Sequence, residues 1–311
     1  MERINAGQFR VVCMAALFTM GSTVISAPYR GSDSYTLIGF AAAFAAALFC
    51  FAGLIPAVNC IYNGGNNGGA YQKIIFGIIY FFTAALLLTD AVFSFNVFCD
   101  FVSRNIIEKT PKPIIALIFA AVIYFAAINR DGTMLKFSLF SAVISAAVIT
   151  VFFFFLMPRF KIEYLLPVEK ISAGGVLSQT VSYFFRVFLP VFPLLLYPCL
   201  CGGEKRSVIT GLAAGGIITA VTMSCGILIF GAEMAADMDY AYANAISTVS
   251  IGYLFTRMDG FSYFVFFATS LVKICICIEL IEKLSAKLNI RRRKTVCAVL
   301  SALMFGINLL V

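Results

Sequence analysis

The chain has 311 residues, of which 61% are apolar and only 12% are charged, and its formal net charge is +8 at pH 7. Soluble domains have about a quarter of their residues charged. Together with a mean hydropathy of +0.97, this excludes an ordinary soluble domain and predicts a protein of the lipid bilayer. Histidine is absent, which excludes Ser-His-Asp catalysis and metal sites with imidazole ligands.

Nine apolar stretches are long enough to cross a membrane as helices. A transmembrane helix needs about 20 mainly apolar residues to cross a hydrocarbon core of ~30 Å. In chain order, we predict helices near residues 9–29, 36–62, 71–99, 113–129, 133–156, 172–200, 207–232, 260–283 and 294–311. The sequence therefore predicts an all-α integral membrane protein.

Lysine and arginine indicate the orientation of these helices. If the N-terminus is cytoplasmic, thirteen of these residues fall in inner segments and eight in outer segments. Because cytoplasmic loops carry the excess of basic residues, we expect the N-terminus inside and Val311 outside. The same placement of positive charge in short segments between spans argues against nucleic acid as a partner.

The segment Asn63–Gly69 between the second and third spans is rich in glycine and asparagine. It lacks the Gly-Lys-Ser/Thr ending of a phosphate-binding loop, and it follows an apolar span instead of a strand. We therefore expect a flexible inner loop.

Two spans contain residues that interrupt a helix. The first interruption comprises Gly21, Ser22, Thr23 and Val24, and the second comprises Phe188, Leu189, Pro190 and Val191, with Pro193 close behind. Proline frees helical carbonyls, and freed backbone groups at membrane depth must be buried in protein or line a water-filled cavity. Because spans one and six correspond in an inverted repeat of five helices, these segments predict a binding site. In the alternative interpretation, they serve helix packing only.

Ionisable residues inside spans are the second indication of a site, because each is costly in hydrocarbon. Asp90 lies in the third span, Arg186 precedes the prolines of the sixth, and Lys273 and Glu279 lie in the eighth. We expect Asp90 to form a buried pair with Arg186 or with Lys273. For Lys273 and Glu279, the alternative is that the side chains extend to the cytoplasmic surface.

Neither a nucleophile–base pair nor a set of metal ligands can be recognised in the sequence. The ten cysteines are scattered through apolar segments without a Cys-x-x-Cys pair. We expect them to act as small apolar side chains, and we expect no enzymatic activity, cofactor or metal ion.

Several short stretches resemble the GerAB-type spore-germination permeases, a branch of the amino acid–polyamine–organocation superfamily. They are Ile4–Phe9, Gly21–Ile25 with Pro28, Asp33–Tyr35, Cys99–Val102 with Thr110–Pro111, and Phe255–Phe261. The resemblance implies a LeuT-type inverted-repeat bundle in one domain over residues 1–311. The first repeat would span about 9–156, and the second, about 172–311, would be incomplete relative to the usual ten helices.

The resemblance also implies a function and a place for the ligand. The protein would be the permease-like subunit of a germinant receptor in the inner membrane of a bacterial spore, beside a larger A-type subunit and a lipoprotein C-type subunit. A nutrient such as an amino acid would bind between the two interrupted segments, with spans three and eight closing the pocket. The alternatives are a proton-coupled amino acid transporter with Asp90 as proton carrier, and a structural or channel-forming subunit without a ligand site.

Overall fold

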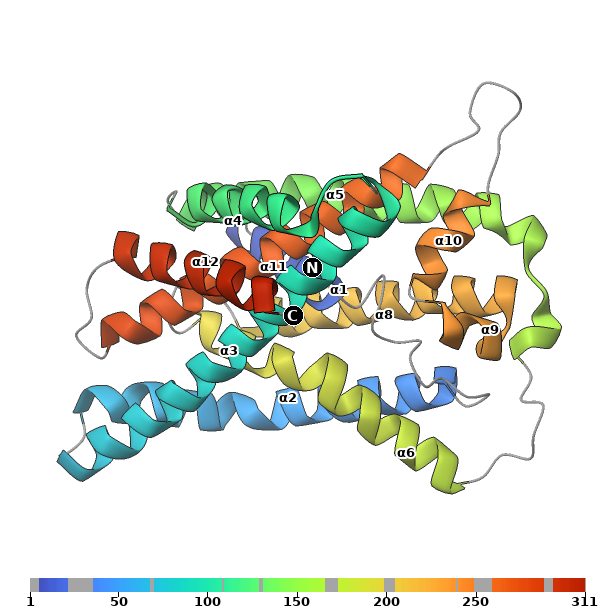
Figure 1. The fold of residues 1–311 in the computed structure, drawn as a ribbon. Coiled ribbons are helices and arrows are strands. Elements are labelled where there is room, and N and C mark those ends of the chain that lie inside the picture. The colour runs from blue at the N-terminus through green and yellow to red at the C-terminus, as the bar shows by residue number, and fades with distance from the viewer. Residues whose placement is uncertain are drawn as a thin grey trace.

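The computed structural model describes residues 6–21, 36–67, 70–107, 109–128, 131–165, 173–198, 205–238, 240–248, 259–287 and 293–310. Within these ranges the chain is a bundle of helices without strands (Figure 1). The larger helices are α1 (Ala6–Met20), α2 (Thr36–Asn67), α3 (Ala70–Asn105), α4 (Lys112–Ile128), α5 (Asp131–Leu156), α6 (Ala173–Tyr183), α8 (Lys205–Phe230), α11 (Asp259–Lys287) and α12 (Arg293–Leu310). Each of the nine predicted spans therefore overlaps a described helix, although residues 22–29 of the first lie outside the described residues and the sixth continues beyond α6 in helical segments of other types.

Five of these helices are long and apolar enough to cross a membrane, judged by length and composition. The qualifying stretches are Thr36–Leu54, Gly77–Asn105, Thr133–Arg159, Lys205–Phe230 and Gly260–Ala286. Large apolar side chains such as Phe81 and Phe125 are about two-thirds exposed, as expected of a surface that faces lipid and not water. The prediction of an all-α membrane protein is confirmed.

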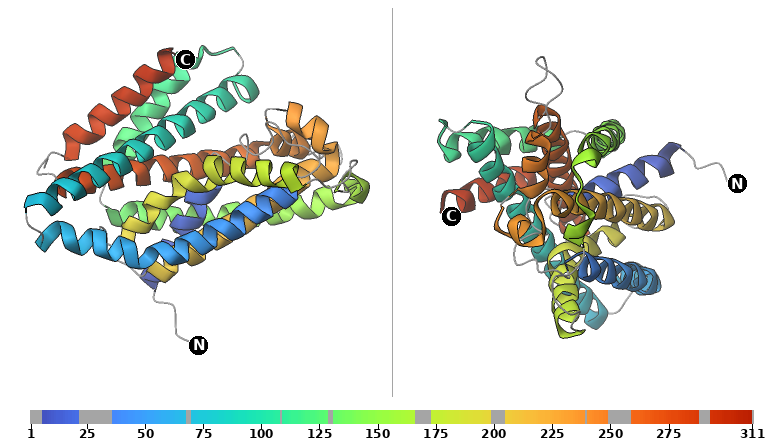
Figure 2. Two further views of the ribbon diagram at one scale, coloured as in Figure 1. Left: turned by 90° about the horizontal axis from the view of Figure 1, so that it is seen from below. Right: turned by 90° about the vertical axis from the view of Figure 1, so that its right-hand side faces the viewer.

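The helix α11 lies at the centre of the bundle. Its spanning stretch is 89% buried within the protein, whereas the corresponding stretch of α2 is 28% buried. It packs against α1, α3, α4, α5 and α12. Figure 2 shows α12 lying beside α4, and Figure 1 shows α3 running obliquely from the end of α2 towards α11. A polar side chain in the spanning stretch of α11 is therefore mostly surrounded by protein and not by lipid.

The glycine-rich segment differs from its prediction. The helix α2 continues to Asn67 and α3 begins at Ala70, so residues 63–67 are helical and do not belong to a loop. The prediction was wrong because extending an existing helix adds a hydrogen bond for each residue that is fixed, whereas starting one is unfavourable. A long apolar helix therefore carries unfavourable residues at its end, at a cost of about 1 kcal/mol for each glycine.

Short helical segments connect the large helices on the side where α5 ends. They are η1 (Met157–Arg159), η2 (Ile162–Leu165), α9 (Ala232–Asp237) and α10 (Ala241–Ser247). The backbone N–H of Lys161 donates to the carbonyl of Leu228 over 2.9 Å, which joins this connection to the end of α8. The connection that follows α5 is thereby fixed to the second half of the chain.

Candidate functional site

The first interrupted segment begins where it was predicted. The helix α1 ends at Met20, and the N–H of Gly21 donates to the carbonyl of Leu17 over 2.8 Å. The other predicted members of this segment, Ser22, Thr23 and Val24, lie outside the described residues.

The end of α1 packs directly on α11. A Cβ atom at Gly21 would lie 2.8 Å from Cδ and 3.0 Å from Cβ of Lys273, and 3.1 Å from the carbonyl oxygen of Thr269. These distances are shorter than ordinary van der Waals contacts. Glycine therefore fits here as the chain stands, whereas any larger residue requires Lys273 or the backbone of α11 to shift. The end of α1 and the lysine of α11 are therefore fixed relative to each other.

Lys273 forms a buried ion pair with Asp90 of α3. Its Nζ atom lies 2.8 Å from Oδ1 of Asp90, and both side chains are only 4% exposed. The same Nζ lies 5.5 Å from the ring centroid of Phe18, a distance at which a cation is attracted to the face of the ring. The pair confirms one of the two pairings predicted for Asp90. It joins α1, α3 and α11 at one point.

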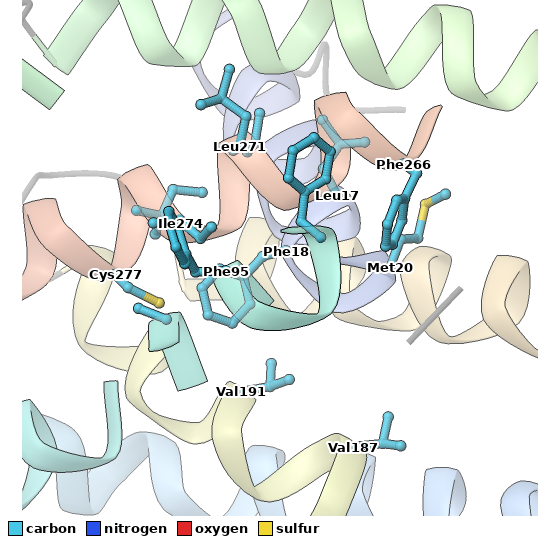
Figure 3. Close-up of a cluster of buried hydrophobic side chains, with 14 of the residues drawn as sticks. Leu17, Phe18, Met20, Phe95, Val187, Val191, Phe266, Leu271, Ile274 and Cys277 are labelled. Atoms are coloured by element: carbon cyan, nitrogen blue, oxygen red, sulfur yellow. The ribbon is translucent and has the colours of Figure 1, made fainter. Parts of the chain in front are cut away.

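The surroundings of this pair are apolar. Figure 3 shows Phe18, Phe95, Ile274 and Cys277 gathered where α1, α3 and α11 meet, and all four are buried. A charge in such surroundings is tolerated only when it is paired. The pair therefore holds the three helices in a defined arrangement, since separation would leave both charges without compensation.

Several buried oxygen atoms near the centre of the bundle lack a hydrogen-bond partner in the described part of the chain. They are Oδ2 of Asp90 and the hydroxyl oxygens of Ser141, Ser145 and Ser270. Ser141 and Ser145 are buried on α5, which packs against α1 and α11. Because buried polar atoms normally have partners, these atoms are where a bound molecule or ordered water would complete the structure.

The second interrupted segment is a change of helix type without a gap in the chain. The α-helix α6 ends at Tyr183, the π-helical turn η3 covers Phe184–Phe188, and the 3-10 helix η4 covers Leu189–Leu196. Pro190 stands at the start of η4 and Pro193 lies inside it. Proline prevents regular α-helical hydrogen bonding, and π turns are frequent at functional sites.

This irregular segment packs against α1, α2 and α3. The ring of Phe188 lies 5.6 Å from that of Phe40 and 5.8 Å from that of Phe44, both on α2. Val187 and Val191 are buried and point towards the apolar cluster of α1 and α3 (Figure 3), whereas Leu189 and Pro190 are half-buried. The second interrupted segment therefore packs on α1, the helix that ends directly before Gly21.

Two other ionisable residues were predicted inside spans. The side chain of Arg186 lies outside the described residues, so its predicted pairing with Asp90 stays a prediction. Glu279 forms an ion pair with Lys283 one turn further along α11, with 3.3 Å between Nζ and Oε1. Lys273 is enclosed and does not extend to the surface, which removes that alternative for it.

Two hollows in the described part of the chain are lined by residues other than the ion pair. One of about 10 Å³ is lined by Val148 and Ile149 of α5, Tyr242 and Ile246 of α10, and Val265 of α11, with Ala243 and Ser262. The other is an open groove beside Phe140, Ile144, Gly260, Phe261 and Phe264. Neither is lined by a predicted site residue. Among the described residues, no group of three cysteine or acidic side chains is placed to hold a metal ion.

Sequence reasoning missed two close contacts between helices. A Cβ atom at Gly215 of α8 would lie 2.6 Å from the carbonyl oxygen of Ala16, and Gly211 one turn earlier also faces α1. The Gly-x-x-x-Gly spacing is a known pattern for close helix packing and was visible in the sequence. Asn308 of α12 donates from Nδ2 to Oδ1 of Asn96 on α3 over 2.6 Å, and nothing in the sequence marked this pair.

Taken together, the fold and the buried pair define a multi-pass α-helical membrane protein with irregular helices and a buried ion pair among its apolar side chains. A family model described as spore germination protein matches residues 67–311, which include α3, η4 and α11. The chain belongs to this family, the GerAB-type spore germination permeases. A search of curated proteins finds no match. The suspected family is confirmed, although the match begins after α1 and most of α2.

Proposed function

We propose that the protein is the permease-like membrane subunit of a spore germinant receptor, which recognises a small nutrient such as an amino acid and triggers germination. The single observation that carries this proposal is that α1 ends at Met20 and the next residue, Gly21, lies against Lys273 of the buried Asp90–Lys273 pair. The irregular segment η4 also packs on α1. Interrupted helices that meet near intramembrane charges are the usual setting of a binding site in transporter folds.

The proposed ligand site lies between the two interrupted segments. Its members are Gly21, Ser22, Thr23, Val24, Phe188, Leu189, Pro190 and Val191, with Asp90, Arg186 and Lys273 as the ionisable groups. The described part of this region is closely packed, so ligand entry requires α1 or η4 to move. A nutrient would act by binding one of two arrangements of these helices more tightly than the other.

The packing of the helices supports two repeats, one of about 9–156 and one of about 172–311. In these repeats α1 corresponds to α6, α2 to α8, α3 to α11 and α4 to α12. The contact of α1 with α8 then has a counterpart in the contact of α6 with α2, and the contact of α4 with α11 has one in the contact of α12 with α3. All four contacts are present. Such matched contacts are expected of inverted repeats in transporter folds.

The partners and location follow from the family alone. We expect an A-type and a C-type receptor subunit beside this chain in the inner membrane of the spore, and lipid around its exposed apolar side chains. Pull-down of the tagged chain from spore membranes, followed by mass spectrometry, tests this expectation.

A thermal-shift screen of the purified full chain against amino acids and nucleosides tests recognition directly. A ligand that binds the native state raises the melting temperature. Gly21→Leu and Pro190→Ala should abolish the shift, whereas Gly53→Leu is the matched control because a Cβ at Gly53 meets no atom within 4 Å. Absence of any shift across the screen, or a shift that survives both variants, would contradict the proposal.

The second candidate is a proton-coupled amino acid transporter, which the buried carboxylate of Asp90 favours. Uptake of labelled amino acid into proteoliposomes that contain only this chain would establish it. Uptake should then depend on an imposed pH gradient and fail in Asp90→Asn. Binding without uptake would favour the receptor.

A further inference from the structure

The Asp90–Lys273 pair has the charges needed to recognise both ends of a zwitterion. We propose that an amino acid ligand inserts between the two side chains, so that its ammonium group binds the carboxylate of Asp90 and its carboxylate binds the ammonium of Lys273. The inference rests on the proposed nutrient recognition and narrows it to the class of zwitterionic ligands.

Burial of the pair supplies the selectivity. Both side chains are 4% exposed, so water cannot replace a lost partner. A ligand with a single charge can pair with only one of the two side chains, so separating the pair leaves the second side chain buried without a counter-charge. A neutral ligand leaves both side chains without one. A zwitterion compensates both at once, which makes it the class that separates the pair at the lowest cost.

The carboxylate of Asp90 has capacity for a second donor. Its Oδ1 accepts from Lys273, whereas Oδ2 is buried and has no hydrogen-bond partner among the residues that the structure describes. Ser94 donates to the backbone carbonyl of Asp90 and not to the carboxylate. An ammonium group has three donors, and Oδ2 of Asp90 can accept from one of them. This carboxylate oxygen is therefore an acceptor for the ligand's ammonium that the closed structure leaves unused among the described residues.

Movement of Lys273 would be transmitted to α1. The side chain of Lys273 lies against Gly21, so displacement of the ammonium shifts atoms that touch the end of α1. The helix α1 is in turn packed on the glycine face of α8 at Gly211 and Gly215. The closed pair holds α3 to α11 in the absence of ligand, and ligand entry separates them while moving α1. Recognition and the conformational signal would then share the same side chains.

Ligand analogues test the inference on the unmodified full chain in detergent. The probes are the twenty amino acids, their carboxamides, their N-acetyl derivatives and inosine, each in a thermal-shift titration. We expect at least one amino acid to bind, and its carboxamide and its N-acetyl derivative to bind about tenfold more weakly or worse. Equal binding of the carboxamide, or binding of inosine alone, would overturn the inference while nutrient recognition stands. Failure of every probe would overturn nutrient recognition itself.

A pair of double variants tests the same side chains. Asp90→Asn with Lys273→Gln removes both charges together and leaves no uncompensated charge, and it should abolish the amino acid shift. The matched control is Asp100→Asn with Lys112→Gln, which removes the ion pair of 2.9 Å between the end of α3 and the start of α4. The control should retain the shift. Retained affinity in the first double variant would overturn the inference, and the analogue comparison decides the question should that variant not fold.

Discussion

Gly21 and Lys273 are in contact although 251 residues separate them in the chain, and the contact leaves no space for a side chain at position 21. Gly21 directly follows Met20, the last residue of α1, and Lys273 carries a buried charge on α11. The interruption of α1 and the intramembrane ion pair are therefore parts of one structure. A substitution at Gly21 should therefore disturb the ion pair, and a substitution of Lys273 should disturb the end of α1.

Gly21→Ala should destabilise the protein. The added Cβ would lie 2.8 Å from Cδ of Lys273 and 3.1 Å from the carbonyl oxygen of Thr269, and the backbone oxygen cannot turn away. Overpacking of this kind costs about 1–3 kcal/mol. The free energy of unfolding in mixed detergent micelles measures it. Gly53→Ala, where the new Cβ meets nothing within 4 Å, should be neutral or slightly stabilising, and equal effects of the two changes would show that the contact is not this close.

Removing one charge of the Asp90–Lys273 pair should lower the free energy of unfolding much more than removing both charges. Lys273→Met leaves a carboxylate buried in apolar surroundings and should cost about 3–5 kcal/mol. Lys273→Met combined with Asp90→Asn leaves no buried charge and should recover most of that loss. A double-mutant cycle in the same unfolding assay gives the coupling between the two positions. Additive effects of the two single changes would mean that the side chains do not interact.

The apolar pattern predicted the bundle because apolar stretches of sufficient length are obliged to form helices in a bilayer. The buried pair was predicted as one of two alternatives, since an intramembrane carboxylate requires a cation but sequence does not show which helix faces it. The sequence predicted an interruption of the helix around Pro190, but it did not predict that a π turn and a 3-10 helix would replace the α-helix there. Which hydrogen bonds replace the α-helical ones depends on packing against α1, α2 and α3, and no local sequence pattern records that packing.

The glycine face of α8 should be essential for its packing on α1. A Cβ at Gly215 would lie 2.6 Å from the carbonyl oxygen of Ala16 and 2.8 Å from Cβ of Thr19, so Gly215→Ala requires the two helices to separate. We expect a loss of about 1–3 kcal/mol in unfolding free energy. Gly306→Ala on α12 is the control, because no atom lies within 4 Å of its new Cβ. A stable Gly215→Ala protein with unchanged ligand response would show that α1 and α8 are free to move apart.

The hydrogen bond from Asn308 to Asn96 should contribute modestly to stability. It joins α12 to α3 over 2.6 Å, but Oδ1 of Asn308 is buried without a partner. Hydrogen bonds between transmembrane helices contribute about 0.6 kcal/mol on average and up to ~1.7 kcal/mol. Asn308→Leu should therefore cost about 1 kcal/mol or less, because the lost bond is offset by the removal of an uncompensated carbonyl. Asn96→Leu leaves the whole amide of Asn308 unpaired at this contact and should cost more. The difference between the two variants in unfolding free energy measures this asymmetry, and the reverse order would show that the α12 side chain has a partner other than Asn96.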